Sequence, residues 1–243
     1  MHATCRTRGQ PTASSPSFGT MNSRIKHSNS LTFTQEARRA QIVQAAIETI
    51  AELGCSKASF DKITRHAGLS STGMISYHFS GKTELFMEIV NTIHGIAGEV
   101  SRSHINNKDT YREKVGAYIQ ANFDFVSRYP AHAKALAEIV ALKHCRGIDG
   151  LESVERQVMS VDRLVDLLEE GRSAGEFGTF DSHTMAMVIR TAIDAFFQRH
   201  FSRSELDLDR CARQLTDIFD RCTQPADRTG AGSPAEQAQK VFP

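Results

Sequence analysis

The chain has 243 residues, 40% of them hydrophobic, so it can bury a substantial core as one domain or as a small domain joined to a larger one. No run approaches the length of about eighteen apolar residues that a membrane span needs, and the N-terminus shows no apolar signal core, so we expect a soluble, cytoplasmic protein. The five cysteines include no close pair, which argues against a disulfide framework and a zinc knuckle.

The formal net charge of +1 hides an uneven distribution of charge along the chain. Residues 1–82 hold ten basic and four acidic side chains, whereas the remaining residues hold 19 basic and 24 acidic ones. Such a distribution favours a DNA-facing end attached to a body that has no need to touch nucleic acid.

Both ends of the chain have the composition of disordered segments. Residues 1–31 are rich in Ser, Thr, Gly and Pro, and residues 223–243 are rich in Pro, Gly, Ala and Gln, so neither stretch can bury enough apolar surface to order itself. Arg24 and Lys26, in the basic N-terminal arm, are candidates to reach phosphates or a minor groove beside a main DNA site.

A long helix is predicted from Thr32 or Thr34 to residue 53, with Gln35 as a capping-box partner of Thr32 and Gly54 as the stop. Arg38 and Arg39 near its start either touch the DNA backbone or lie on a solvated face. The apolar stripe that would pack this helix into the core is Ile42, Ala46, Ile50 and Leu53.

Residues 59–82 are predicted to form two short helices joined by a glycine turn. Ser59 can cap the first helix and Gly68 ends it. In the second, about residues 71–79, Ile75 and Phe79 lie four apart on one face. This is the pattern of a helix-turn-helix, although any helical hairpin of an all-helical core has similar spacing. The side chains left to point elsewhere are Ser71, Thr72, Ser76 and Tyr77.

The stretch from Ile42 to Leu85 resembles the TetR family of bacterial transcription regulators. In particular, residues 72–79 with the sequence TGMISYHF, followed by Gly81 and Lys82, resemble the branch that includes repressors of choline and betaine metabolism. Two features depart from the family pattern. The turn containing Leu69, Ser70 and Ser71 is one residue longer, and Ser76 stands where many members carry tyrosine.

The resemblance implies that residues 32–80 are a DNA-binding domain whose recognition helix, about residues 71–78, enters the major groove. Lys82 opposes the dipole of the helix it begins, and its position makes better sense if a phosphate approaches that helix end. The candidates near bases are Thr72, Gly73 and Ser76, the candidates at phosphates are Ser59, Tyr77, His78 and Lys82, and Ser71 belongs to the same surface.

The rest of the chain, residues 81–222, keeps a helical pattern, and no segment alternates as a strand does, so the predicted fold is all-α. A helix starting at about Lys82 behind a Ser80 cap would connect the DNA-binding end to the body. Further helices are predicted over residues 110–128, 131–146, 151–172, 182–201 and 206–222.

The last two predicted helices carry more apolar surface than one terminal hairpin needs. TetR-like proteins dimerise through their final two helices, so the resemblance implies a homodimer; the alternative is that both faces are internal core. The candidate interface residues are Met185, Val188, Ala192, Phe196, Leu208, Ala212, Leu215 and Phe219.

The body also has large apolar side chains that either fill its core or line a pocket for an effector. The resemblance implies a small-molecule effector without naming it, and choline or betaine rests on the branch resemblance alone. The candidate pocket residues are Tyr118, Phe123, Leu136, Ile139, Val140, Met159, Leu164 and Leu168.

Catalysis finds no support, because the chain lacks a Gly-rich phosphate loop, a nucleophile elbow and a His-Glu-x-x-His pair. We therefore predict no catalytic residue, cofactor, metal site or membrane partner. The predicted function is a DNA-binding repressor released from a palindromic operator on double-stranded DNA by an effector. The alternatives are a helical adaptor that binds only protein, which has no use for the basic arm and the hairpin, and a helical-bundle enzyme.

Overall fold

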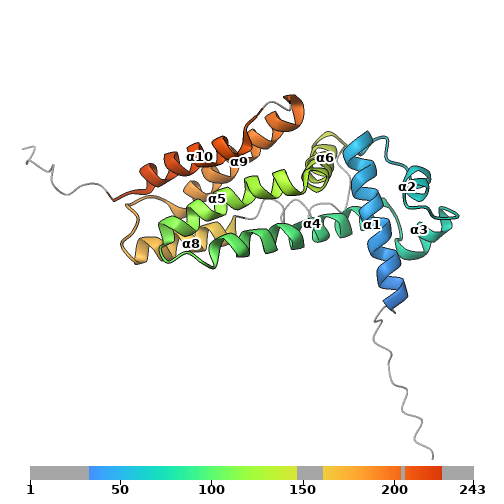
Figure 1. The fold of residues 1–243 in the computed structure, drawn as a ribbon, viewed down its shortest axis with the longest axis horizontal. Coiled ribbons are helices and arrows are strands. Elements are labelled where there is room, and N and C mark those ends of the chain that lie inside the picture. Colours follow the sequence, from blue (N-terminus) through green and yellow to red (C-terminus); the bar gives the residue numbers. More distant parts are fainter. Residues whose placement is uncertain (1–32, 147–160, 204–205, 226–243) are drawn as a thin grey trace, which may run out of the picture.

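A computed structural model describes residues 33–146, 161–203 and 206–225 of the chain. Within these ranges it contains helices and no strand, which confirms the predicted all-α fold (Figure 1). The predicted arm and most of the predicted tail lie outside the described residues, as does the first half of the predicted helix over residues 151–172. None of the helices in the described ranges is both long and apolar enough to cross a bilayer.

The helices agree with the predicted ones to within two or three residues at most ends. The long N-terminal helix begins at Phe33, and the second short helix of the predicted hairpin has six residues. The helices are α1 Phe33–Leu53, α2 Phe60–His66, α3 Gly73–His78, α4 Lys82–Ile105, α5 Tyr111–Arg128, α6 Pro130–Arg146, α8 Asp162–Ser173, α9 Ser182–Arg203 and α10 Leu208–Thr223.

The three N-terminal helices form one end of an elongated molecule, and α4 leaves this end to run along the body beside α5 (Figure 1). Helix α5 is central, because it contacts α4, α6, α8, α9 and α10. Helix α6 packs against α1 as well as against α4. The body therefore touches the N-terminal end through two helices.

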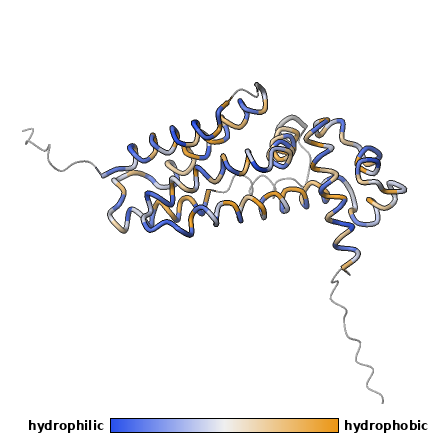
Figure 2. The backbone as a smooth tube through the Cα atoms, in the orientation of Figure 1, coloured by the Kyte–Doolittle hydropathy of each residue, from blue (hydrophilic) through white to orange (hydrophobic). Residues whose placement is uncertain are grey.

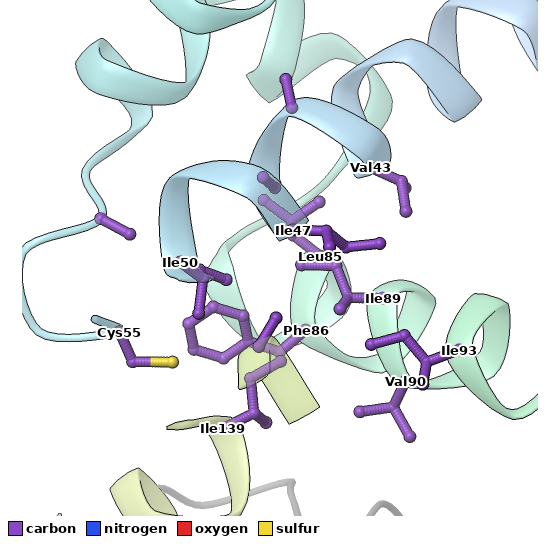
Figure 3. Close-up of a cluster of buried hydrophobic side chains, with 14 of the residues drawn as sticks. Val43, Ile47, Ile50, Cys55, Leu85, Phe86, Ile89, Val90, Ile93 and Ile139 are labelled. Carbon is purple, nitrogen blue, oxygen red and sulfur yellow. The ribbon is translucent and has the colours of Figure 1, made fainter. Parts of the chain in front are cut away.

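A junction core fills the space where α1, α4 and α6 meet. Figure 2 shows that α4 is largely apolar along its length, as expected of a helix that packs on both parts of the molecule. The buried stripe of α1 includes Ile42, Ala46 and Ile50, as its spacing predicts. The labelled side chains in Figure 3 are Val43, Ile47, Ile50, Cys55, Leu85, Phe86, Ile89, Val90, Ile93 and Ile139.

A second core, the body core, lies between α5, α8, α9 and α10. Phe123 of α5 is buried at its centre and makes edge contacts with Phe196 and Phe197 of α9, with ring centroids 5.9 and 5.2 Å apart. The other large buried side chains include Ile119, Leu164, Leu168, Ile189, Ile193, Leu215 and Phe219.

The helix ends follow the sequence signals with one exception. Gly54 and Gly68 end α1 and α2 with φ angles of 79° and 65°, which an L side chain rarely adopts. The predicted Ser80 cap of α4 is wrong, because the N-cap is Gly81. The backbone N–H and the hydroxyl of Ser80 instead donate to Glu84, both at 2.8 Å. The Glu84 carboxylate thus lies in the first turn of α4, where it interacts favourably with the positive end of the helix dipole.

Candidate nucleic-acid interface

The helix-turn-helix is built on α1. Ser59 caps α2 by accepting a hydrogen bond of 3.3 Å from the backbone N–H of Lys62. Gln41 of α1 donates to the backbone oxygen of Ala67 at 2.7 Å and so ties the end of α2 to α1. Residues 67–72 then form the turn, and α3 begins at Gly73. The start of the recognition helix, uncertain from the long turn, is thereby located.

Helix α3 has one buried and one exposed face. Ile75 and Phe79, at the end of the helix, are buried in the junction core. Their burial fixes the orientation of α3, because both side chains pack into the junction core. The exposed face consists of small polar residues and one aromatic residue, namely Ser71, Thr72, Gly73, Ser76 and Tyr77.

The aromatic residue of this face is held in place although it is 72% exposed. Gln35 of α1 donates a hydrogen bond of 3.2 Å to the hydroxyl of Tyr77. His78 makes an edge contact with the Tyr77 ring, with centroids 5.0 Å apart. A large side chain that is both exposed and positioned is a common feature of a binding surface.

Arg39 lies beneath α3 and connects three helices. Its guanidinium donates to the backbone oxygen of His78 at 2.6 Å and pairs with Glu84 and Glu88 of α4 at 3.3 and 2.9 Å. It also stacks on the ring of Phe79, 4.2 Å from the centroid. The prediction that Arg39 touches DNA or lies on a solvated face is therefore wrong, because two carboxylates one turn apart on α4 engage it.

Lys82 is exposed at the start of α4. The nearby carboxylate of Glu84 accepts hydrogen bonds from Ser80. The bond from the Ser80 backbone, and after it the bond from the hydroxyl, lowers the pKa of Glu84. The exposed Lys82 is the first residue of α4, four residues after the end of α3. A cation there has the correct sign for a DNA phosphate.

Residues 42–89, which contain α2, α3 and the junction with α4, match the family model described as "Bacterial regulatory proteins, tetR family". Residues 42–89 thus form a TetR-family DNA-binding domain. The match covers the elements whose geometry is described above, so the family assignment and the exposed α3 face rest on the same stretch.

Curated relatives match a little over a third of the chain. The HTH-type transcriptional regulator BetI 1 of Chromohalobacter salexigens is 36% identical over 91 residues, which is 37% of this chain and 45% of that protein. BetI 2 of the same organism is 36% identical over 89 residues, or 36% and 42% of the two chains. This protein thus matches less than half of the length of either relative.

Solved structures match over most of the chain. A putative TetR-family regulator from Rhodococcus sp. has a TM-score of 0.68 at 18% identity, over 76% of this chain and 98% of that one. The fatty acid degradation regulator FadR from Bacillus halodurans has a TM-score of 0.63 at 21% identity, over 75% and 94%. At such identities the likeness establishes the fold alone.

The structure divides the predicted effector-pocket residues between the two cores. Tyr118, Phe123, Leu164 and Leu168 belong to the body core, whereas Leu136, Ile139 and Val140 pack in the junction core because α6 turns toward α1. Met159 lies outside the described residues. A groove of about 820 Å³ between α5 and α10 is lined by none of them.

The predicted dimer residues also fall into two groups. On α10, Ala212, Leu215 and Phe219 are buried in the protomer's own body core. On α9, Val188 is 51% exposed, and its neighbour Met187 is exposed beside it. Met185, Ala192, Phe196 and Leu208 are partly buried. The placement of all eight at a dimer interface stays a prediction.

Proposed function

We propose that this protein is a homodimeric DNA-binding transcriptional regulator, a repressor released from a palindromic operator by a small-molecule effector. The observation that carries the proposal is the exposed polar face of α3, anchored from below by Ile75 and Phe79 within a TetR-family domain. The relatives BetI 1 and BetI 2 are named as transcriptional regulators of the helix-turn-helix type, which supports the same role.

In the proposed complex α3 lies in the major groove, where an α-helix fits and where base edges are distinguishable. Thr72, Gly73 and Ser76 approach bases. Tyr77 and Lys82 approach phosphates, with Ser71 and His78 alongside. Ser59 has already used its oxygen as the α2 cap, but its hydroxyl proton remains free for a phosphate oxygen.

The proposed dimer uses the outer sides of α9 and α10. Met187, Val188 and Ile218 are large apolar side chains that this protomer leaves exposed there. A second copy that brings the same surfaces together would remove them from water and satisfy two-fold symmetry. Two-fold symmetry of the protein then requires an operator with two half-sites on matching faces of the duplex.

The proposed switch couples the body to α3 through two helices. Helix α4 is continuous from Lys82 into the body. Helix α6 contacts the turn after α1, where Glu138 accepts a hydrogen bond of 3.3 Å from the backbone N–H of Cys55. An effector that shifts α4 or α6 would move α1 and change the separation of the recognition helices. A tenfold loss of operator affinity requires about 1.4 kcal/mol of preference for the released shape.

The decisive experiment is a titration of the full chain against palindromic fragments from the region upstream of its own gene, at two salt concentrations. A DNA-binding regulator binds one fragment more tightly than a scrambled sequence, and its affinity falls steeply with salt because phosphate contacts release counterions. An adaptor that binds only protein would show equal, weak binding to all fragments, which would refute the proposal.

A further inference from the structure

A cluster of polar groups lies inside the body, between α4, α5 and α9. At its centre is Arg190 of α9, whose side chain is 21% exposed. The guanidinium donates to the carboxylate of Asp194 at 3.1 Å from Nε, pairs with its other oxygen at 2.8 Å from Nη2, and donates to Oδ1 of Asn122 at 3.3 Å. Burying a charged group between packed helices costs free energy unless the charge is paired, and here Asp194 supplies the opposite charge.

The donors of this cluster are not all used. A guanidinium has five N–H groups; Asp194 and Asn122 engage three of them and the hydroxyl of Tyr118 a fourth, which leaves one among the described residues. Burial lowers the pKa of Arg190, but the charge of Asp194 and the hydroxyl of Tyr118 outweigh it, so this pKa lies above its ordinary value. The group is therefore a permanent cation with one N–H left for a further partner.

His94 of α4 faces this cation without a hydrogen bond. Its buried Nε2 atom has no partner within the part of the chain that the structure describes. Burial lowers the pKa of His94, and the charge of Arg190 lowers it further, which puts the ring within electrostatic reach of the guanidinium. A group placed between His94 and Arg190 therefore meets a positive potential and an unsatisfied nitrogen.

The surface of α4 next to His94 offers space. Gly98 lies one turn further along the same face, and a Cβ added there would meet, among the described residues, only Nη1 of Arg102 at 3.9 Å. On the opposite wall, Phe197 is one turn from Asp194 on α9 and contacts Phe123. There is thus room on α4 one turn beyond His94, and an apolar side chain on α9 one turn beyond Asp194.

We propose that this cluster binds a small organic carboxylate, whose anionic head pairs with Arg190 and hydrogen-bonds to His94 while its apolar part lies against Phe197. The inference rests on the proposed function, because it gives the chemical class of the effector. A carboxylate suits the site because Arg190 is a fixed cation with one N–H left, and because the unpartnered Nε2 of His94 can donate in one of its two neutral tautomers. A phosphate, which carries more charge, loses more hydration on entering such an apolar setting.

The test compares acids with their neutral amides. Octanoate and benzoate, each beside octanamide and benzamide, are titrated against the full chain without DNA, by calorimetry and thermal shift. We expect each acid to bind at least tenfold more tightly than its amide. Equal binding of acid and amide, or no binding of either acid, would overturn the proposal.

Two variants localise the binding. Arg190→Gln with Asp194→Asn removes the cation without leaving an unpaired charge, and Gly98→Leu fills the space on α4 while improving helix propensity. Both should lose at least tenfold in affinity for octanoate. The matched control is Arg112→Gln with Asp220→Asn, which removes another Arg–Asp pair and should bind as wild type does.

If the Arg190/Asp194 variant binds octanoate as tightly as wild type, the acid binds elsewhere and the proposed carboxylate site is refuted. The link to regulation is tested separately, by repeating the operator titration with octanoate present. Binding of the acid without a change in operator affinity would support the site and refute the effector role in the proposed function.

Discussion

The junction core and the body core differ in the polar groups they enclose. The labelled side chains of the junction core are apolar apart from Cys55, whose thiol pKa is raised to about 12 by burial and by the charge of Glu138 (Figure 3). That thiol is protonated at neutral pH and acts as a small apolar group. The body contains Arg190, Asp194 and the unpaired nitrogen of His94.

This difference separates two tasks. The junction core fixes α3 against α1 and α4, so that a small polar face keeps its orientation toward DNA. The body retains polar groups that packing alone does not require, which is typical of a region that binds a ligand.

The largest effect is expected for Leu215→Asp in the body core. Leu215 is buried, so the substitution leaves an unpaired charge in an apolar setting and should cost more than about 4 kcal/mol, enough to unfold the chain. Gln214→Asp on the same helix is the control, since Gln214 is exposed and lies beside Leu215 in the sequence. Urea unfolding followed by circular dichroism measures both; a folded Leu215→Asp variant would contradict the placement of α10.

The next effect is a cavity in the junction core. Ile89 is fully buried on α4, and Ile89→Ala should lower the free energy of unfolding by about 2–5 kcal/mol. Met87, two residues away and exposed, provides the control Met87→Ala, which should change stability by less than about 0.5 kcal/mol. Similar losses of unfolding free energy for the two variants would contradict the placement of Ile89 in a closely packed junction core.

A smaller loss is expected when the fork of Arg39 is removed. Arg39→Lys keeps the charge but cannot hold the His78 oxygen, Glu84 and Glu88 together, so stability should fall by about 1–2 kcal/mol. Operator affinity should fall alike for every sequence, because α3 loses its orientation and no base contact is altered. Arg38 donates to Gln41 within α1, so Arg38→Lys should leave both quantities unchanged.

The smallest effect concerns the pair between α5 and α10. The hydrogen bonds from Arg112 hold the pKa of Asp220 below its ordinary value of 3.8. The pair therefore stabilises the fold above that pH, and its contribution is lost as the pH falls through the lowered pKa. Because Asp220 is 37% exposed, the contribution should stay below about 1 kcal/mol.

Urea midpoints of wild type and Asp220→Asn, measured at about pH 6 and about pH 3, test this pair. The two proteins should differ at the higher pH and converge at the lower one. A difference that is constant across this range would mean that the carboxylate charge contributes nothing.

Much of the fold was accessible from the sequence because its signals are local. The spacing of Ile42, Ala46 and Ile50, the stops at Gly54 and Gly68, and the anchors of α3 all act within a few residues. The role of Arg39 was not accessible, since its partners on α4 lie 45 and 49 positions away. The four-residue spacing of Glu84 and Glu88 was the available signal, and it indicates a shared face without naming the partner.

The body was harder to predict because apolar residues on a helix do not reveal which neighbour they face. Leu215 and Phe219 suit a dimer interface and a protomer core equally well by spacing, and the structure buries them within the protomer. The polar cluster was also missed: Arg190 and Asp194 resemble an ordinary surface pair at four-residue spacing, and only packing brings Asn122 and His94 to them.

The central claim is that the outer face of α3 reads bases while the start of α4 holds phosphates. The most direct measurement selects preferred sites from a randomised operator library with wild type, Ser76→Ala and Lys82→Ala. Ser76→Ala should lose preference at one position in each half-site, by about 1–3 kcal/mol, whereas Lys82→Ala should keep the preferred sequence and reduce the salt slope by about one. An unchanged preference in Ser76→Ala together with an altered one in Lys82→Ala would contradict this assignment.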